Sequence, residues 1–90
     1  MMKAVLTVVG KDAVGILSKV STKCAEYNVN ILDVSQSILQ DMFCMIMVVD
    51  VDKINVPFGE FSDIMSKMGD EIHMSIHVMH EDLFNSMHRI

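Results

Sequence analysis

The chain of 90 residues carries a formal net charge of −5 and is 51% hydrophobic. A chain of this length forms one domain around a single core, and its hydrophobic content excludes a disordered protein. No apolar run approaches the roughly 18 residues that a membrane helix needs, and the first residues offer no signal peptide. We therefore expect a cytoplasmic protein that binds no membrane. The 7 Lys and Arg residues are scattered along the chain, which argues against a nucleic-acid partner.

The first half of the chain predicts a strand, a helix and a hairpin. Lys3 to Val9 is rich in β-branched residues, which favours a strand. Helical periodicity follows from Ala13 to Asn28. Val29 to Gln40 and Met42 to Val51 predict two strands joined through the short turn between them. The buried stripe of the helix is expected to comprise Val14, Leu17, Val20, Cys24 and Tyr27.

The second half predicts another helix, a strand and a tail. Asn55 is placed to cap a helix with Pro57 in its first turn, and Gly69 is expected to end it. Ile72 to His80 alternates as a fourth strand, and Glu81 to Ile90 has the pattern of a short amphipathic helical tail. The buried stripe of this helix is expected to comprise Phe58, Phe61, Ile64, Met65 and Met68.

The order βαββαβ predicts an α+β fold, the ferredoxin-like sandwich, in which a four-stranded antiparallel sheet carries two helices on one face. Strands one and three should be central. Residues 1–80 would form the domain, and residues 81–90 a tail packed on the domain or on a dimer. Both faces of the third strand are apolar, so the face away from the helices needs cover from the tail or from a second subunit. We expect a homodimer or a higher homo-oligomer.

A glycine-bracketed turn connects the first strand to the first helix. It reads Gly10-Lys11-Asp12-Ala13-Val14-Gly15-Ile16. Unpaired backbone N–H groups and the positive end of a helix dipole suit a small anion such as a carboxylate. The plainer interpretation is that a connection between a strand and a helix needs a glycine or two.

The turn and the start of the second strand resemble the ACT domain, a ferredoxin-like module that senses small molecules. Residues 10–17 are similar to the family pattern G-x-D-x-x-G-[IL]-[LV], and residues 28–34 to its N-I-x-D pattern. The hairpin and the ending, residues 83–90, are similar to short stand-alone ACT proteins, which resemble one half of the glycine cleavage repressor. The resemblance covers nearly the whole chain.

The resemblance implies an amino-acid site at a dimer interface and an unknown protein partner that receives the signal. Donors in the turn would hold the ligand's carboxylate, and acceptors on Asp12 and Asn30 its ammonium. One departure from the family is Ala13-Val14, where many members have an x-Pro pair. The residues carried over as ligand-binding are Gly10, Lys11, Asp12, Ala13, Val14, Gly15, Ile16, Asn30 and Ile31.

Three of these residues also have structural interpretations. Asp12 is placed to cap the first helix, Gly15 to permit close packing of helix on sheet, and Asn30 to satisfy backbone groups where the strand begins.

Other reactive side chains predict neither catalysis nor a metal or cofactor. Cys24 and Cys44 form no CxxC pair and are expected to be reduced, buried thiols. His73 and His77 share a strand face about 13 Å apart, too far to hold one ion. The 10 methionines should fill core and interface.

Two enzyme or nucleic-acid functions of this fold are disfavoured. A phosphate-handling enzyme would want an arginine in its cradle, and the only arginine is Arg89 in the tail. An RNA-binding module would want aromatic residues on its central strands. The sequence therefore indicates a non-catalytic regulatory module that binds an amino acid. The alternative is an adaptor for protein interaction that has lost ligand binding.

Overall fold

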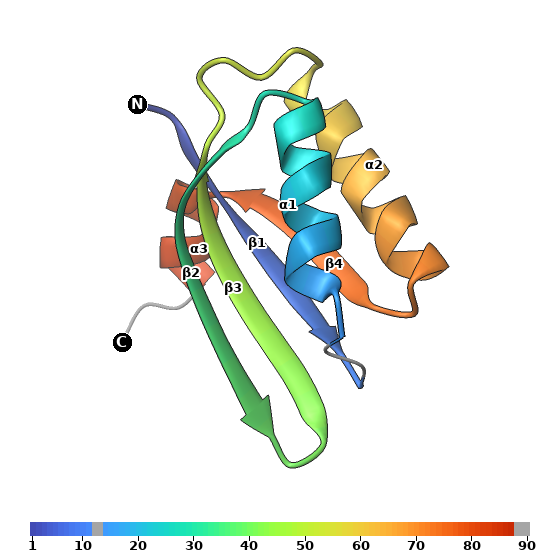
Figure 1. Cartoon of the computed structure of the whole chain (residues 1–90). Coiled ribbons are helices and arrows are strands. Elements are labelled where there is room, and N and C mark those ends of the chain that lie inside the picture. The colour runs from blue at the N-terminus through green and yellow to red at the C-terminus, as the bar shows by residue number, and fades with distance from the viewer. Residues whose placement is uncertain (12–13, 88–90) are drawn as a thin grey trace.

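The computed structural model of the chain describes residues 1–11 and 14–87. They form a four-stranded antiparallel sheet with α1 and α2 on one face (Figure 1). The sheet order is β2-β3-β1-β4, so β1 and β3 are central and the predicted ferredoxin-like fold is confirmed. The elements are β1 (Lys3–Gly10), α1 (Ile16–Glu26), β2 (Asn30–Leu39), β3 (Met42–Asp50), α2 (Phe58–Glu71), β4 (Ser75–His80) and α3 (Glu81–Met87).

The two apolar faces predicted for β3 are confirmed, and they have different surroundings. The buried set, Phe43, Met45, Met47 and Val49, belongs to the core beneath the helices. On the outer face, Val5 pairs with Val48 of β3 and Met79 of β4. Helix α3 packs against β1 and β4 across the sheet from α1 and α2 (Figure 1). Val5 is only 2% exposed, whereas Ile46 is 42% exposed. Helix α3 therefore covers part of the outer face and leaves Ile46 open.

Helix α1 begins three residues later than predicted. Its N-cap is Gly15, which has the left-handed φ of 71°. The N-cap position is therefore Gly15, and Asp12, expected to cap the helix, lies outside the described residues. Because the left-handed turn sets the phase of the helix, Ile16 faces the sheet and is buried. The predicted stripe residues Val14 and Leu17 are instead 82% and 38% exposed.

Helices α1 and α2 end in the same way. Asn28 follows α1 with φ 62°, and the Val29 amide donates to the Cys24 carbonyl at 2.8 Å. Past α2, His73 adopts φ 59°. Asparagine tolerates this left-handed position better than most residues. Because residues 72–74 form the loop that closes α2, β4 starts at Ser75 and not at Ile72 as predicted.

Gly69 lies inside α2 and does not end it. The helix continues to Glu71, and the Met74 amide donates to the Gly69 carbonyl at 2.8 Å. A Cβ on Gly69 would lie 2.6 Å from the Met74 carbonyl oxygen. The glycine is therefore required by the close approach of α2 to the start of β4.

Two further predictions about local structure are wrong. The ladder between β2 and β3 shifts register between Ile31 and Asp33, so β2 is not the regular strand expected from Val29 to Gln40. Asn55 does not cap α2, whose N-cap is Pro57. The Asn55 Nδ2 atom donates instead to the Glu26 carbonyl at 3.3 Å. It ties the loop before α2 to the end of α1.

Candidate functional site

The turn between β1 and α1 exposes Lys11 and Val14 to solvent. Asp12 and Ala13 lie outside the described residues. Ile16 is buried, so its side chain cannot reach a ligand from solvent. A Cβ on Gly15 would meet nothing within 4 Å, and its φ is 71°. The interpretation of Gly15 as a close-packing residue is therefore wrong. It is needed for its left-handed conformation, which lets the chain enter α1 at this point.

Asn30 lies at the opposite end of the sheet from the turn. It pairs with Asp50 of β3, which pairs with Lys3 at the start of β1. Gly10 pairs with Phe43 at the other end of the same ladder. At about 3.3 Å per residue the two ends of β1 are roughly 23 Å apart. One chain therefore does not bring Asn30 and the turn together.

A polar hollow adjoins Asn30. It has a volume of about 330 Å³ and is lined by Asn28, Asn30, Asp50 and Lys53. Asn28 comes from the loop after α1, Asn30 from the start of β2, Asp50 from the end of β3, and Lys53 from the loop before α2. A second hollow of about 260 Å³ also borders Asn30, with Ala25 and Val29 in its wall. Asn30 thus stands between two concave surfaces.

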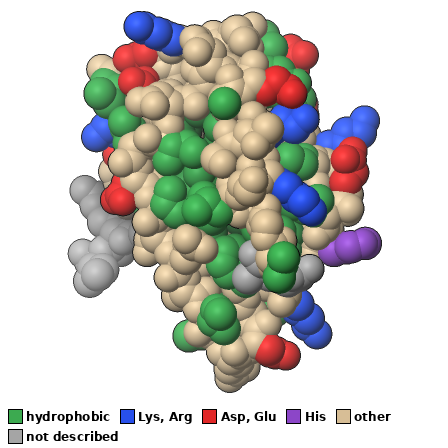
Figure 2. Space-filling model, in the orientation of Figure 1, with side chains coloured by type: hydrophobic (Ala, Val, Ile, Leu, Met, Phe, Trp, Pro, Cys, Tyr) green, Lys and Arg blue, Asp and Glu red, His purple; other side chains and the backbone are tan. Residues whose placement is uncertain are grey.

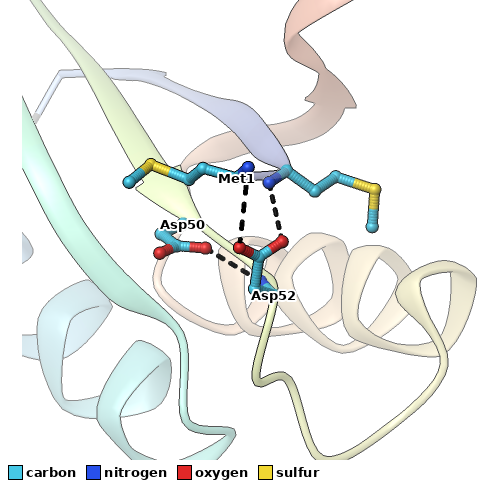
Figure 3. A network of polar contacts seen from close by, with 4 residues as sticks. Met1, Asp50 and Asp52 are labelled. Carbon is cyan, nitrogen blue, oxygen red and sulfur yellow. Dashed lines mark hydrogen bonds and ion pairs between the residues drawn. The ribbon is translucent and has the colours of Figure 1, made fainter.

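Another cavity, of about 430 Å³, lies between the N-terminal segment and the start of α3. The Met2 amide donates to Asp52 Oδ1 at 2.7 Å, and the Met1 amine lies 3.9 Å from Asp52 Oδ2 (Figure 3). The Asp52 amide in turn donates to Asp50 Oδ1. Asp52 therefore fastens the start of β1 to the loop after β3.

Three reactive side chains, Cys24, His77 and His80, are engaged in packing or in local contacts. Burial raises the pKa of the Cys24 thiol to about 11, so it is no nucleophile at neutral pH. Cys44 is a free, half-buried thiol. His77 Nε2 lies 3.2 Å from Ser75 Oγ, and the His80 ring stacks on Phe58 with centroids 4.2 Å apart. His73 lies beyond α2 and not on β4, so its predicted shared strand face with His77 is wrong.

Two searches of residues 1–11 and 14–87 bear on function. They contain no group of three or more His, Cys, Asp or Glu side chains placed to hold a metal ion. They also contain no helix of the length and apolar character that crossing a bilayer requires.

The family model described as ACT domain matches residues 3–78 of the sequence. The chain belongs to the ACT domain family. A UPF0237 protein of Listeria innocua is 46% identical over 99% of this chain and 100% of its own length. A UPF0237 protein of Methanopyrus kandleri is 41% identical over the full length of both. ACT domains are typically regulatory modules that bind small molecules.

Solved structures agree with this assignment. The ACT domain protein from Streptococcus pneumoniae is 37% identical, has a TM-score of 0.82, and matches 92% of this chain and 93% of its own. A putative glycine cleavage system transcriptional repressor superposes with a TM-score of 0.72 at 18% identity. The match covers 88% of the present chain and 45% of the repressor chain. At this identity the likeness shows the shared fold.

The sequence did not reveal that Asn28, Asp50 and Lys53 surround Asn30 in this ACT domain. Counting back from the hairpin turn with an uninterrupted ladder would pair Asn30 with Val51. The register shift at Leu32 pairs it with Asp50 instead. The one available signal was Asn28 at the end of a predicted helix, because asparagine favours left-handed loop positions.

Proposed function

We propose that this ACT domain is a regulatory module that senses an amino acid at a homodimer interface and signals to a separate partner protein. The observation that carries the proposal is the separation of the turn and Asn30 by the length of the sheet. A site that uses both needs two chains.

The position of β2 supports one dimer geometry. β2 is an edge strand, and it runs parallel to β1 because both are antiparallel to β3. Pairing of two β2 edges across a twofold axis would be antiparallel and would extend the sheet. The Asn30 end of one β2 would then lie beside the hairpin end of its neighbour. That end of the neighbour's sheet carries the turn after Gly10.

Exposed apolar side chains supply further support for this edge as an interface. Ile38 on β2 is 69% exposed, and Leu17 on α1 is also open to solvent. Figure 2 shows hydrophobic side chains gathered at the centre of the helix-bearing face, beside α1, with others toward the hairpin tip. Burying such surface stabilises a dimer by about 25 cal/mol per Å² before the entropic cost of association.

The two halves have complementary chemistry for a zwitterion. Backbone N–H groups at the start of α1 suit a carboxylate, aided by the helix dipole. The Asn30 side-chain oxygen can accept a hydrogen bond from an ammonium group. The open space around Gly15 allows a ligand to approach the backbone closely, whereas the Met74 side chain fills the space beside Gly10.

A thermal-shift screen of the twenty amino acids tests the proposal, with sedimentation of the free and ligand-saturated protein. Because ligand would bridge two chains, it should raise the melting temperature and also tighten the dimer. Asn30→Ala should lower affinity by roughly tenfold to a hundredfold, the loss of one or two hydrogen bonds worth about 1–3 kcal/mol. A flat screen would contradict ligand sensing and leave the adaptor as the function of this fold.

A further inference from the structure

We infer that Asp50 and Lys53 flank Asn30 as an opposite-charge pair that holds the ammonium and carboxylate groups of an amino acid with an uncharged side chain. The inference rests on the proposed function and adds to it a ligand class and two binding residues beside Asn30. The backbone N–H groups of the partner's turn would donate to the same carboxylate from across the interface. Neither residue belongs to the turn or to the N-I-x-D pattern through which the sequence resembles the family.

The walls of the hollow are fixed by hydrogen bonds that leave its ligand-facing groups free. Asn28 Nδ2 donates to the Lys53 carbonyl at 2.9 Å, which fastens the loop before α2 to the end of α1. The Asn55 amide reinforces that link by donating to the Tyr27 carbonyl at 3.1 Å. Asp50 is held by the Asp52 amide, which donates to its Oδ1 atom at 2.9 Å (Figure 3). A site whose walls are already ordered loses little entropy when ligand binds.

The polar atoms left over match the two ends of an amino acid. Among residues 1–11 and 14–87, neither the Lys53 ammonium nor the Asn30 side-chain amide makes a hydrogen bond or ion pair. Asp50 uses Oδ1 for the Asp52 amide and so has Oδ2 for an ammonium donor. Lys3 is the cross-strand neighbour of Asp50, yet their charges form no ion pair in the described part of the chain. One cation, one anion and two amides therefore line the hollow.

The charge balance of the hollow selects the ligand class. Asp50 and Lys53 sum to zero, as do the ammonium and carboxylate of a neutral amino acid. Phosphate would find one cation and be repelled by Asp50, whereas phosphate sites gather several donors of positive charge. The volume of about 330 Å³ lies at the small end of the roughly 300–1,000 Å³ range of ligand sites, as a small zwitterion requires.

The inference is tested by removing one charge at a time, first from the protein by substitution and then from the amino acid by chemical modification. The probes are the twenty amino acids, the N-acetyl and amide derivatives of those that bind, and inorganic phosphate. The variants are Lys53→Gln and Asp50→Asn, where the asparagine oxygen can still accept from the Asp52 amide. Lys67→Gln and Asp63→Asn on exposed positions of α2 make the same charge changes away from the hollow. Calorimetry measures affinity, and thermal melts of free protein confirm folding.

The expected result is that Lys53→Gln and Asp50→Asn each weaken binding by about tenfold or more, while the α2 variants bind like wild type. N-acetylation of the amino acid should lower its affinity for the wild-type protein. The loss should be far smaller for Asp50→Asn, because that variant already lacks the carboxylate that binds the ammonium. One outcome overturns the inference and leaves the proposed function standing. In it, an amino acid binds and Asn30→Ala weakens the binding, but the two charge variants do not. If no amino acid binds, both the inference and the proposed function are contradicted. Binding of phosphate in preference to amino acids overturns the inference.

Discussion

Two glycines in α2 provide a matched test of how closely the helix approaches the sheet. A Cβ on Gly69 would lie 2.6 Å from the Met74 carbonyl oxygen and 2.9 Å from Ile76 Cγ1. A Cβ on Gly59, in the first turn of the same helix, would meet nothing within 4 Å. Alanine at either position gains about 0.5–1 kcal/mol of helix propensity. Only at position 69 must backbone move, and overpacking of this kind costs about 1–3 kcal/mol.

We expect Gly69→Ala to lower the free energy of unfolding by up to about 2.5 kcal/mol, the overpacking cost less the gain in propensity. Gly59→Ala should raise it by about 0.5–1 kcal/mol. Because both variants gain the same propensity, they differ by the overpacking cost of about 1–3 kcal/mol, and for a domain of this size their melting temperatures should differ by roughly 4–24 °C. Urea unfolding followed by circular dichroism at one protein concentration measures the free energy of unfolding of both variants, and thermal melts measure their melting temperatures. Equal midpoints for the two variants would refute the close approach of α2 and β4.

The pKa of the Cys24 thiol is raised from 9.0 to about 11 by burial, so the folded state keeps a proton that the unfolded chain releases above pH 9. Stability should therefore fall by about 2–3 kcal/mol between pH 9 and pH 11, and a pH slope that persists unchanged in Cys24→Ala would contradict this. The half-buried Cys44 should react with a thiol reagent in the folded protein before the buried Cys24 does. Ile38→Lys should yield monomers in sedimentation while Ile46→Lys on the outer sheet face leaves the dimer intact, and the reverse outcome would favour packing of sheets face to face. Gly15→Ala should cost about 1 kcal/mol in urea unfolding, because its φ of 71° is unfavourable for a side chain even though space is free.

The sequence alone determined the architecture, because hydrophobic periodicity reports which faces are buried. Alternation along Met42 to Asp50 predicted two apolar faces, and the structure buries one beneath the helices. The order of elements left one sensible sheet, with the first and third strands at its centre, since connections in such folds are short and do not cross. The hairpin was fixed locally, because Leu39 and Met42 close a turn of two residues. The turn after Gly10 and Asn30 were identified as motifs, while their separation along the sheet followed only from the strand pairing.

Tertiary structure decided the points where backbone departs from regular geometry. Periodicity extends smoothly through Gly15 and Gly69, so it did not show that one glycine starts α1 in a left-handed turn while the other lies against β4. The register shift after Ile31 is likewise invisible in the alternation, yet it sets Asp50 opposite Asn30. Lys53 joins them because Asn28 and Asn55 fasten its loop to the end of α1. The pairing of Asn30 with Asp50 and the hydrogen bonds of Asn28 and Asn55 join residues distant in sequence. Their energy depends on the packed chain and not on any local pattern.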